Sequence, residues 1–327
     1  MLWGGVGCSR MTNAVVISGS GLVPAATSRD VLDRLADFLR LNVNDGDASE
    51  RTVQSYLTHV GQFTRWCWAE DIDPSQATPK DLAHFRRYLV DRRYTRSTIN
   101  VKLSAVRRFY QAVTWYGLRQ DNPAEGLRPP RDHTTRRDRL LERYLSPEEI
   151  DSLMELPNTD TPVGKRDLAM LAVLYYHALR VSEVAGLSLH DLKAGDPTTL
   201  HVVESKGHKS RVLVMTVKSL AFLKPWLAVR SQFIRDDDEP MFLSAKGGRR
   251  LTPQGVRWIV RQYLRAAGLY RDGMGPHAIR HAHASHAVAN GADINALAAE
   301  LGHASVQTTT VYVHVVDAVK QNPAEFL

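Results

Sequence analysis

Cysteine is scarce in this sequence. Among 327 residues only two cysteines occur, Cys8 and Cys67, and they lie far apart in the chain. This pattern excludes a disulfide framework and a cysteine zinc site, and it is typical of a protein of the reducing cytosol. No apolar run approaches the roughly 18 residues that a membrane helix needs. The sequence therefore predicts a cytoplasmic protein with no membrane partner.

Common cofactor motifs are also missing. The Gly-Ser-Gly at residues 19–21 is not followed by the Gly-Lys-Ser/Thr of a nucleotide-binding loop. There is no His-Glu-x-x-His motif, and no carboxylate or cysteine set completes a zinc site around the histidines of one later segment. These histidines are His277, His281, His283 and His286. We therefore expect neither a metal nor a cofactor.

Basic residues, by contrast, are in excess. The sequence has 42 lysines and arginines against 35 aspartates and glutamates, which gives a formal net charge of +7. An excess of positive charge favours a polyanionic partner, and nucleic acid before a membrane surface. Many basic proteins bind nothing acidic, so net charge alone does not establish nucleic-acid binding. The distribution of charge along the chain is the stronger indication.

The first 120 residues divide into two parts. Residues 1–28 are small, apolar and rich in glycine, and we expect a disordered extension there. In residues 29–120 apolar side chains recur every three or four positions, which predicts a small bundle of helices. Thr78 with Asp81 marks the start of one helix, and Gly117 marks the end of another.

Basic residues gather in the second half of this bundle. Any single arginine on a helix is more often a solvated surface residue, but the clustering favours contact with phosphate groups. The residues that we expect to contact DNA here are Arg92, Arg93, Arg96, Lys102 and Arg107.

The next stretch, residues 121–140, contains three prolines and shows no apolar periodicity. We interpret it as an extended linker between two domains. Its positive charge suits an extended segment that lies along a DNA backbone. The side chains expected to contact DNA there are Arg128, Arg131, Arg136 and Arg137. A second domain is expected over residues 141–327, where Ser146 and Glu149 form a capping box at a helix start.

Two kinds of pattern occur in the second domain. Residues 164–179 are mostly apolar, which is typical of a buried helix, and helical patterns return after Leu251. Between them, two β-branched runs flank the sequence Lys-Gly-His-Lys, which predicts a β-hairpin with Lys206 at its tip. Lys209 and Arg211 add charge to this hairpin, and we expect them to contact DNA. The expected fold is therefore mainly α-helical with a small β-sheet.

Several polar residues occur where structure alone does not require them. Arg180 ends the apolar segment, where an arginine usually pairs with a carboxylate such as Glu183. The alternative is a donor aimed at a phosphate and oriented by Glu183. Lys206 is ordinarily a solubilising turn residue, yet a cation at a hairpin tip can protonate a leaving oxygen. His277 and Arg280 are three residues apart, so they share a helix face.

The last candidate is Tyr312. It follows His303 by nine residues and is expected about two turns into a helix that Ser305 caps. Taken alone, it is better explained as a core residue beside Val311 and Val315. The other candidates reverse that judgement, because phosphodiester cleavage without a metal needs a nucleophile, cationic donors, an acid and a base.

In order and spacing these motifs resemble those of the tyrosine recombinases, the phage integrase family. The residues that carry the resemblance are Arg180 in HALRVSEV, Lys206 in SKGHKSR, His277 and Arg280 in PHAIRH, His303 in ELGHAS and Tyr312 in TTTVYVH. The C-terminal segment is most similar to the Xer-type branch, and the resemblance covers about residues 30–320. The chain departs from the family pattern at Ala178, where glycine is common.

This resemblance implies a fold and a reaction. The fold would be an N-terminal helical core-binding domain of the SAM-like kind, followed by a mixed α/β catalytic domain with a C-terminal helix. The protein would be an enzyme, a site-specific DNA recombinase. It would act through a 3′-phosphotyrosyl intermediate and a Holliday junction, in integration, excision or dimer resolution.

The resemblance also implies the role of each residue at the phosphate. Tyr312 would attack the scissile phosphate, and Arg180 and Arg280 would neutralise its non-bridging oxygens. Glu183 would position Arg180. Bond energy would be kept in the phosphotyrosyl ester, so neither ATP nor a metal would be required.

Proton transfer would fall to three further residues. By resemblance, Lys206 would protonate the departing 5′-oxygen. His277 would act as a base or orient the tyrosine, and His303 would donate to the phosphate.

The implied partner is double-stranded DNA with inverted-repeat core sites. Strand exchange would need a homotetramer on two DNA sites, or a hetero-tetramer with a related recombinase. Two alternatives remain. A type IB topoisomerase would use the same phosphotyrosyl chemistry to relax supercoils without exchanging partners, and a non-catalytic relative would only bind DNA.

Overall fold

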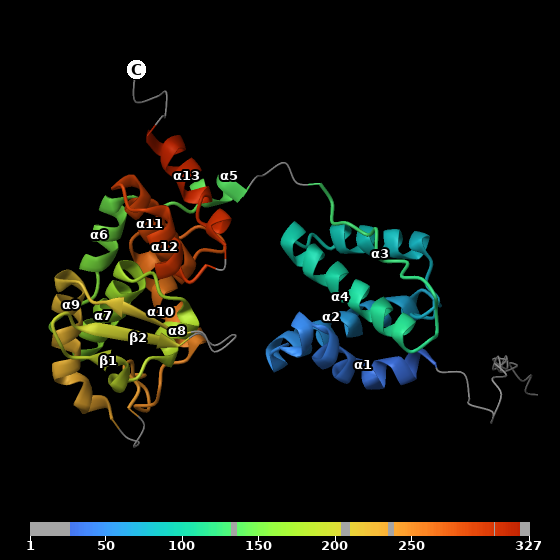
Figure 1. The fold of residues 1–327 in the computed structure, drawn as a ribbon, viewed down its shortest axis with the longest axis horizontal. Coiled ribbons are helices and arrows are strands. Elements are labelled where there is room, and N and C mark those ends of the chain that lie inside the picture. The colour runs from blue at the N-terminus through green and yellow to red at the C-terminus, as the bar shows by residue number, and fades with distance from the viewer. Residues whose placement is uncertain (1–26, 132–135, 204–209, 235–238, 304, 321–327) are drawn as a thin grey trace, which may run out of the picture. The chain divides into compact units, whose positions relative to one another are not determined.

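The computed structural model describes residues 27–131, 136–203, 210–234, 239–303 and 305–320. Within these ranges the chain is mainly helical with a small sheet, and it divides into two compact units, Met1–Asp132 and His133–Leu327 (Figure 1). The predicted fold class is confirmed. The extension expected over residues 1–28 lies almost wholly outside the described residues. No described helix is both long enough and apolar enough to cross a membrane.

The first unit is a bundle of helices packed through their apolar faces. Its helices are α1 (Ser28–Asn42), α2 (Glu50–Ala69), α3 (Pro79–Asp91) and α4 (Arg96–Trp115), with a short 3-10 helix at Asn44–Gly46. Thr78 and Asp81 form the capping box that begins α3. At the centre, Phe63 of α2 meets Phe85 of α3 and Phe109 of α4 edge to face, at ring-centroid distances of 5.1 and 6.0 Å.

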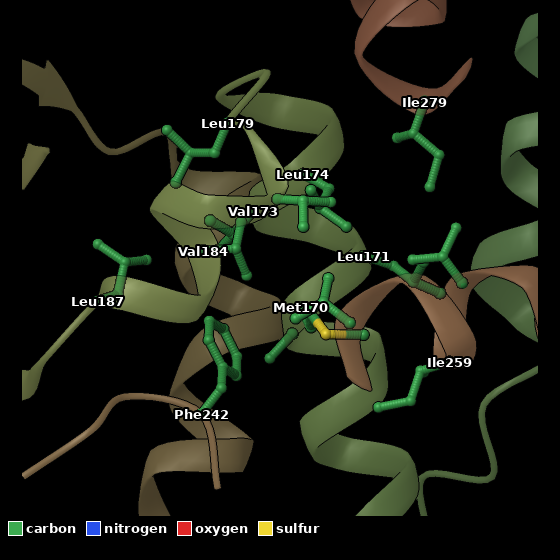
Figure 2. Packing of buried hydrophobic residues seen from close by; sticks show 14 of the residues in the cluster. Met170, Leu171, Val173, Leu174, Leu179, Val184, Leu187, Phe242, Ile259 and Ile279 are labelled. Atoms are coloured by element: carbon green, nitrogen blue, oxygen red, sulfur yellow. The ribbon is translucent and has the colours of Figure 1, made fainter. Parts of the chain in front are cut away.

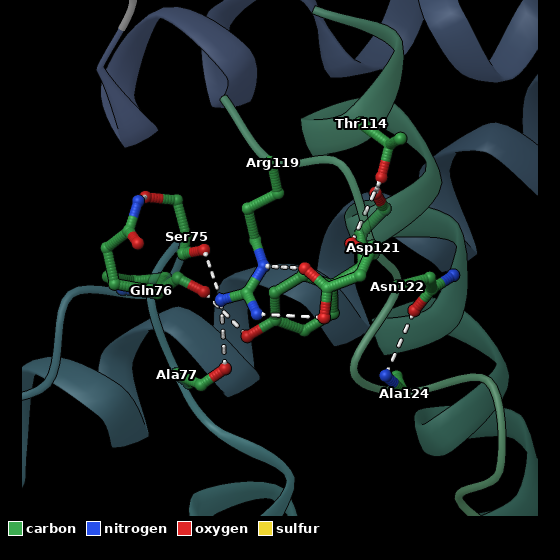
Figure 3. A network of polar contacts seen from close by, with 10 residues as sticks. Ser75, Gln76, Ala77, Thr114, Arg119, Asp121, Asn122 and Ala124 are labelled. Carbon is green, nitrogen blue, oxygen red and sulfur yellow. Dashed lines mark hydrogen bonds and ion pairs between the residues drawn. The ribbon is translucent and has the colours of Figure 1, made fainter. Parts of the chain in front are cut away.

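The chain that follows α4 stays attached to this bundle. Arg119 forms a salt bridge with Asp121 and donates to the Ser75 carbonyl in the loop before α3 (Figure 3). Further along, Leu127 joins the apolar core of the first unit. The apolar core of the first unit therefore reaches Leu127, within the segment 121–140 for which a linker is expected.

The second unit is built around helix α7. Its helices are α5 (Arg136–Leu141), α6 (Pro147–Glu155), α7 (Pro162–Tyr176), α8 (Val181–Gly186), α9 (Val217–Val229), α10 (Pro253–Ala266), α11 (Pro276–Ala289), α12 (Ile294–Leu301) and α13 (Val311–Lys320), with 3-10 helices at Leu189–Asp191, Arg230–Phe233 and Val306–Thr308. Because α7 is apolar on nearly all sides, it lies inside the unit, as the sequence predicts. Met170 and Leu174 of α7 pack in one cluster with Val184 of α8, Ile259 of α10 and Ile279 of α11 (Figure 2).

An antiparallel sheet in the order β1-β2-β3 covers part of this core. Its strands are β1 (Leu192–Lys193), β2 (Thr199–Val203) and β3 (Ser210–Val214). Strands β2 and β3 are the predicted hairpin, in which Val202 pairs with Arg211. Alternate side chains such as Val202 and Leu213 face the core. The predicted tip with Lys206 and Lys209 lies outside the described residues.

A second apolar cluster attaches the end of the chain to the second unit. Tyr312 and Val315 of α13 pack there with Leu140 of α5, Ala284 of α11 and Leu301 of α12. Elements from both ends of the unit thus meet around Tyr312, and this meeting point positions the candidate site.

Candidate active site

Arg180 precedes the first residue of α8, and Glu183 lies one turn further on. The Glu183 carboxylate accepts hydrogen bonds from the Arg180 main-chain N–H (2.7 Å) and from Arg180 Nη1 (2.9 Å). Arg211 of β3 donates to the same carboxylate through both terminal nitrogens, each at 2.9 Å. Burial acts to raise the pKa of Glu183, but the bonds from Arg211 and Arg180 outweigh it and hold the pKa below its ordinary value. Glu183 is therefore a buried carboxylate that fixes two guanidinium groups.

The C-terminal end of α12 holds Arg180 and Arg280 together. Arg180 Nη2 donates to the Gly302 carbonyl at 2.7 Å, and Arg280 Nη2 donates to the Leu301 carbonyl. Gly302 ends the helix in the left-handed conformation, with φ of 60°. Carbonyls at a helix C-terminus carry partial negative charge, so they suit cationic partners. Two arginines from distant parts of the sequence thus meet at one turn.

Arg280 is almost wholly buried, and a second carbonyl holds it. Its Nη1 donates to the carbonyl of Ala178, which has a φ of 47°, in the left-handed region that favours glycine. Alanine at this position keeps the backbone conformation that glycine adopts most easily. Burial, followed by the charge of Arg180, lowers the pKa of Arg280 to about 10. Arg280 is therefore still a cation at neutral pH.

His303 follows the Gly302 turn directly. Its Nδ1 lies 2.8 Å from the hydroxyl of Thr309, a residue with no exposed surface. This contact fixes the orientation of the imidazole ring. Sequence reasoning missed Thr309, because a buried threonine among three consecutive threonines gives no signal of its own.

Tyr312 lies in the first turn of α13, not two turns into a helix that begins after Ser305. The difference arises because Val306–Thr308 form a separate 3-10 helix. Tyr312 is 2% exposed, and its Oη lies 2.6 Å from Nδ1 of His281. The negative charge of an ionised Tyr312 acts to raise the pKa of Arg280. The phenol of Tyr312 therefore lies against the imidazole of His281, within electrostatic range of Arg280.

His277 occupies the first turn of α11, near the surface. Its ring centroid lies 6.3 Å from that of His281. Partial burial and the positive charges of Arg280 and Arg257 lower the pKa of His277. Lys206, the remaining candidate, lies outside the described residues.

The match to known sequences covers this whole cluster. Residues 143–318 match the model of the phage integrase family. The chain belongs to this family. Residues 32–115 of this integrase-family protein match the family's N-terminal SAM-like domain, in agreement with the helical first unit.

Relatives of this chain include tyrosine recombinases of the Xer type. Tyrosine recombinase XerC of Roseiflexus sp. (strain RS-1) is 33% identical over 299 residues, which cover 89% of this chain and 92% of the relative. XerD of Proteus mirabilis is 30% identical over 268 residues, which cover 82% of this chain and 83% of the relative. The predicted resemblance to the Xer branch is confirmed.

Solved structures have the same fold. XerH bound to palindromic difH in a post-cleavage complex matches with a TM-score of 0.67 at 18% identity, over 91% of this chain and 96% of that chain. A lambda integrase dimer bound to a COC′ core site matches with a TM-score of 0.69 at 15% identity, over 88% of this chain and 77% of that chain.

Most of the described residues that were expected to contact DNA lie at the surface of their unit. The exposed ones are Arg92, Arg93, Arg96, Arg128 and Arg131. Arg96 also donates to the Pro130 carbonyl at 2.9 Å, and half-buried Arg107 donates to the Leu127 carbonyl at 2.8 Å. The side chains of Arg136, Arg137 and Lys209 lie outside the described part of the chain.

Two of the expected DNA contacts are corrected by the structure. Lys102 is 4% exposed, and its ammonium donates to Gln62 and lies over the ring of Tyr94. Arg211 has 13% of its side chain exposed and binds Glu183. Lys102 therefore stabilises the bundle, and Arg211 positions Glu183, so neither side chain is presented to DNA.

Two further histidines of α11, His283 and His286, have partners within the protein. Within the described ranges, no group of three or more His, Cys, Asp or Glu residues is arranged to hold an ion. His286 instead contacts the Tyr175 hydroxyl and the Leu145 carbonyl, each at 2.9 Å. His283 lies 3.6 Å from a carboxylate oxygen of Glu300. These two histidines serve packing, which leaves His277 and His281 beside the candidate site.

Proposed function

We propose that this protein is a site-specific DNA recombinase that breaks and rejoins DNA strands through a covalent link to Tyr312. One observation carries the proposal: Arg180, Arg280 and His303 meet at the turn that ends α12, and the phenol of Tyr312 lies 2.6 Å from His281, the neighbour of Arg280 in the sequence. Membership of the phage integrase family supports it, as do relatives that are tyrosine recombinases.

The chemistry of cleavage follows from the residue types. Tyr312 Oη attacks phosphorus, the bond to O5′ breaks, and a 3′-phosphotyrosyl ester forms. Arg180 and Arg280 compensate the negative charge that develops on the non-bridging oxygens, and His303 donates to the same phosphate. Lys206 supplies the proton to O5′. The ester conserves the bond energy, so a 5′-hydroxyl of the exchanged strand reverses the reaction without ATP or a metal.

Three other residues position these groups. Glu183 holds the guanidinium of Arg180 in one orientation, and Arg211 keeps Glu183 ionised and fixed from the opposite side. His277, on the same face of α11 as Arg280, orients the reacting groups at the phosphate.

The substrate is double-stranded DNA with inverted-repeat core sites. The basic side chains exposed on the helical unit bind its phosphates, and the arginines of segment 121–140 contact its backbone. Exchange between two duplexes calls for four protomers, either identical or paired with a related recombinase, acting in the cytoplasm. Lambda integrase and XerH, which share the fold, were each solved on a DNA site.

Covalent capture tests the proposal. The protein first selects a site from a pool of random duplexes, and that site is then rebuilt with a nick so that cleavage cannot be reversed. Tyr312→Phe should abolish the protease-sensitive protein–DNA adduct because it removes the nucleophile. The matched control Tyr270→Phe, which removes a half-buried phenol outside the site, should keep it.

Each other outcome points to a different function. An adduct that persists in Tyr312→Phe excludes Tyr312 as the nucleophile. Relaxation of supercoiled plasmid lacking the selected site supports a type IB topoisomerase. Site binding by the wild-type protein without any adduct identifies a non-catalytic relative.

A further inference from the structure

A histidine without an assigned role contacts the oxygen of Tyr312. Nδ1 of His281 lies 2.6 Å from Oη, and the two ring centroids are 5.7 Å apart. Hydrogen bonds from hydroxyl groups typically span about 2.5–3.0 Å, and a general base must lie about 2.6–3.2 Å from the atom that it deprotonates. Since Tyr312 is 2% exposed, bulk water has little access to this contact. The pair is therefore already in proton-transfer geometry before DNA binds.

The helix that carries His281 also supplies charge for the product of that transfer. Arg280 is its neighbour in the sequence, and the charge of an ionised Tyr312 interacts favourably with the buried Arg280 guanidinium. Removal of the phenolic proton thus creates an anion within electrostatic range of a buried cation, where the low dielectric constant strengthens the attraction. His277, Arg280 and His281 stand at positions i, i+3 and i+4 of α11, so all three lie on one side of the helix.

We propose that His281 is a further catalytic residue, the base that takes the proton of Tyr312 during cleavage. The inference rests on the proposed function, because it requires Tyr312 to be the nucleophile. The proton moves from Oη to Nδ1, the oxygen forms its bond to phosphorus, and the electron pair of the P–O5′ bond leaves with O5′, which takes its proton from Lys206. In rejoining, the imidazolium of His281 returns the proton to the departing phenol.

This assignment divides the work of two histidines on one helix. The family resemblance implies that His277 is the base or orients the tyrosine, but the nitrogen that lies against Oη belongs to His281. His277 stands one turn earlier, nearer the surface, with its ring centroid 6.3 Å from that of His281. In this assignment His277 orients groups at the phosphate, and His281 accepts the proton of Tyr312.

The test measures single-turnover cleavage of the nicked substrate by the full-length protein. His281→Ala should lower the rate by about 100-fold or more, the usual contribution of a general base. His281→Gln offers an amide that can accept a hydrogen bond but cannot take a proton, so it should lose as much. The control His190→Gln changes an exposed histidine and should cleave at the wild-type rate. Added imidazole should partly restore His281→Ala.

Other results overturn the inference and leave the proposed function standing. If wild-type protein forms the adduct and His281→Gln cleaves within about twofold of it, His281 is only a hydrogen-bond partner. Faster cleavage by His281→Ala means that His281 restrains Tyr312. Nitrogen-15 spectra of the wild-type protein provide a test that needs no variant. They should show Nδ1 of His281 unprotonated at the pH of cleavage, and a protonated Nδ1 excludes the base role. Absence of any wild-type adduct would instead refute the proposed function.

Discussion

Ala178 shows how a single backbone position supports the site. Its carbonyl holds Arg280 while its φ of 47° lies where a side chain is disfavoured. Ala178→Gly relieves about 1 kcal/mol of this strain but loses one buried methyl group worth about 0.8 kcal/mol. We therefore expect the free energy of unfolding of the second unit to change by less than about 1 kcal/mol, as measured by denaturant titration.

A larger side chain at the same position should behave differently. Ala178→Val places a β-branched residue at positive φ in a filled cluster, and overpacking alone typically costs about 1–3 kcal/mol. The variant should lose at least about 2 kcal/mol and should cleave more slowly, because the carbonyl that holds Arg280 shifts. Unchanged stability of Ala178→Val would contradict the strained geometry.

At the scale of elements, the connection from α12 to α13 joins the turn that holds Arg180 and Arg280 to Tyr312, the proposed nucleophile. Thr309 lies within this connection, and its hydroxyl holds Nδ1 of His303. Thr309→Val keeps the shape and removes the hydroxyl. We expect cleavage to slow by about tenfold, which is about 1.4 kcal/mol and close to the contribution of one hydrogen bond. DNA affinity should stay unchanged in a gel-shift titration.

Thr309→Ser is the matched control for that prediction. It retains the hydroxyl and loses only a methyl group, so it should cleave close to the wild-type rate. Equal rates for the valine and serine variants would show that the hydroxyl does not orient His303.

The elements themselves could be predicted, but the direction in which some charged side chains point could not. Apolar periodicity located the helices of both units, and the β-branched runs located β2 and β3. Lys102, however, stands three residues after Ile99 and four before Val106, on the buried face of α4. Arg211 alternates with exposed residues of β3 and lies on the side of buried Leu213. Counting charges without assigning faces made both residues candidates for DNA contact.

The candidate site, too, could be predicted only in part. The spacing of the motifs indicated Arg180, Arg280, His303 and Tyr312, because each is a reactive type in an unexpected place. His281 carried a weaker signal, four residues after His277 and thus on the same helix face. Its place among four closely spaced histidines suggests a zinc ligand rather than a base. The partners of Arg180 and Arg280 at the end of α12 are main-chain carbonyls, which no residue pattern can reveal.

At the scale of the whole molecule, the chain consists of a helical unit with exposed arginines and a second unit with the candidate active site. Binding of phosphates by lysines and arginines releases counterions, so affinity for DNA should fall steeply with salt. The exposed arginines of the first unit should account for part of this dependence, and buried Lys102 should account for none, since its ammonium has partners within the protein.

Arg92 and Arg93 provide the sharpest test of whether exposed rather than buried cations bind DNA, because both are exposed at the end of α3. Replacing both with glutamine should reduce the slope of log affinity against log salt by about 1.8, since each phosphate contact contributes about 0.9. The measurement is fluorescence anisotropy of a labelled duplex of arbitrary sequence between roughly 50 and 200 mM salt. Lys102→Met, which removes a buried charge at similar volume, should leave the slope unchanged. A slope that falls in Lys102→Met but not in the double variant would mean that the bundle binds DNA through another face.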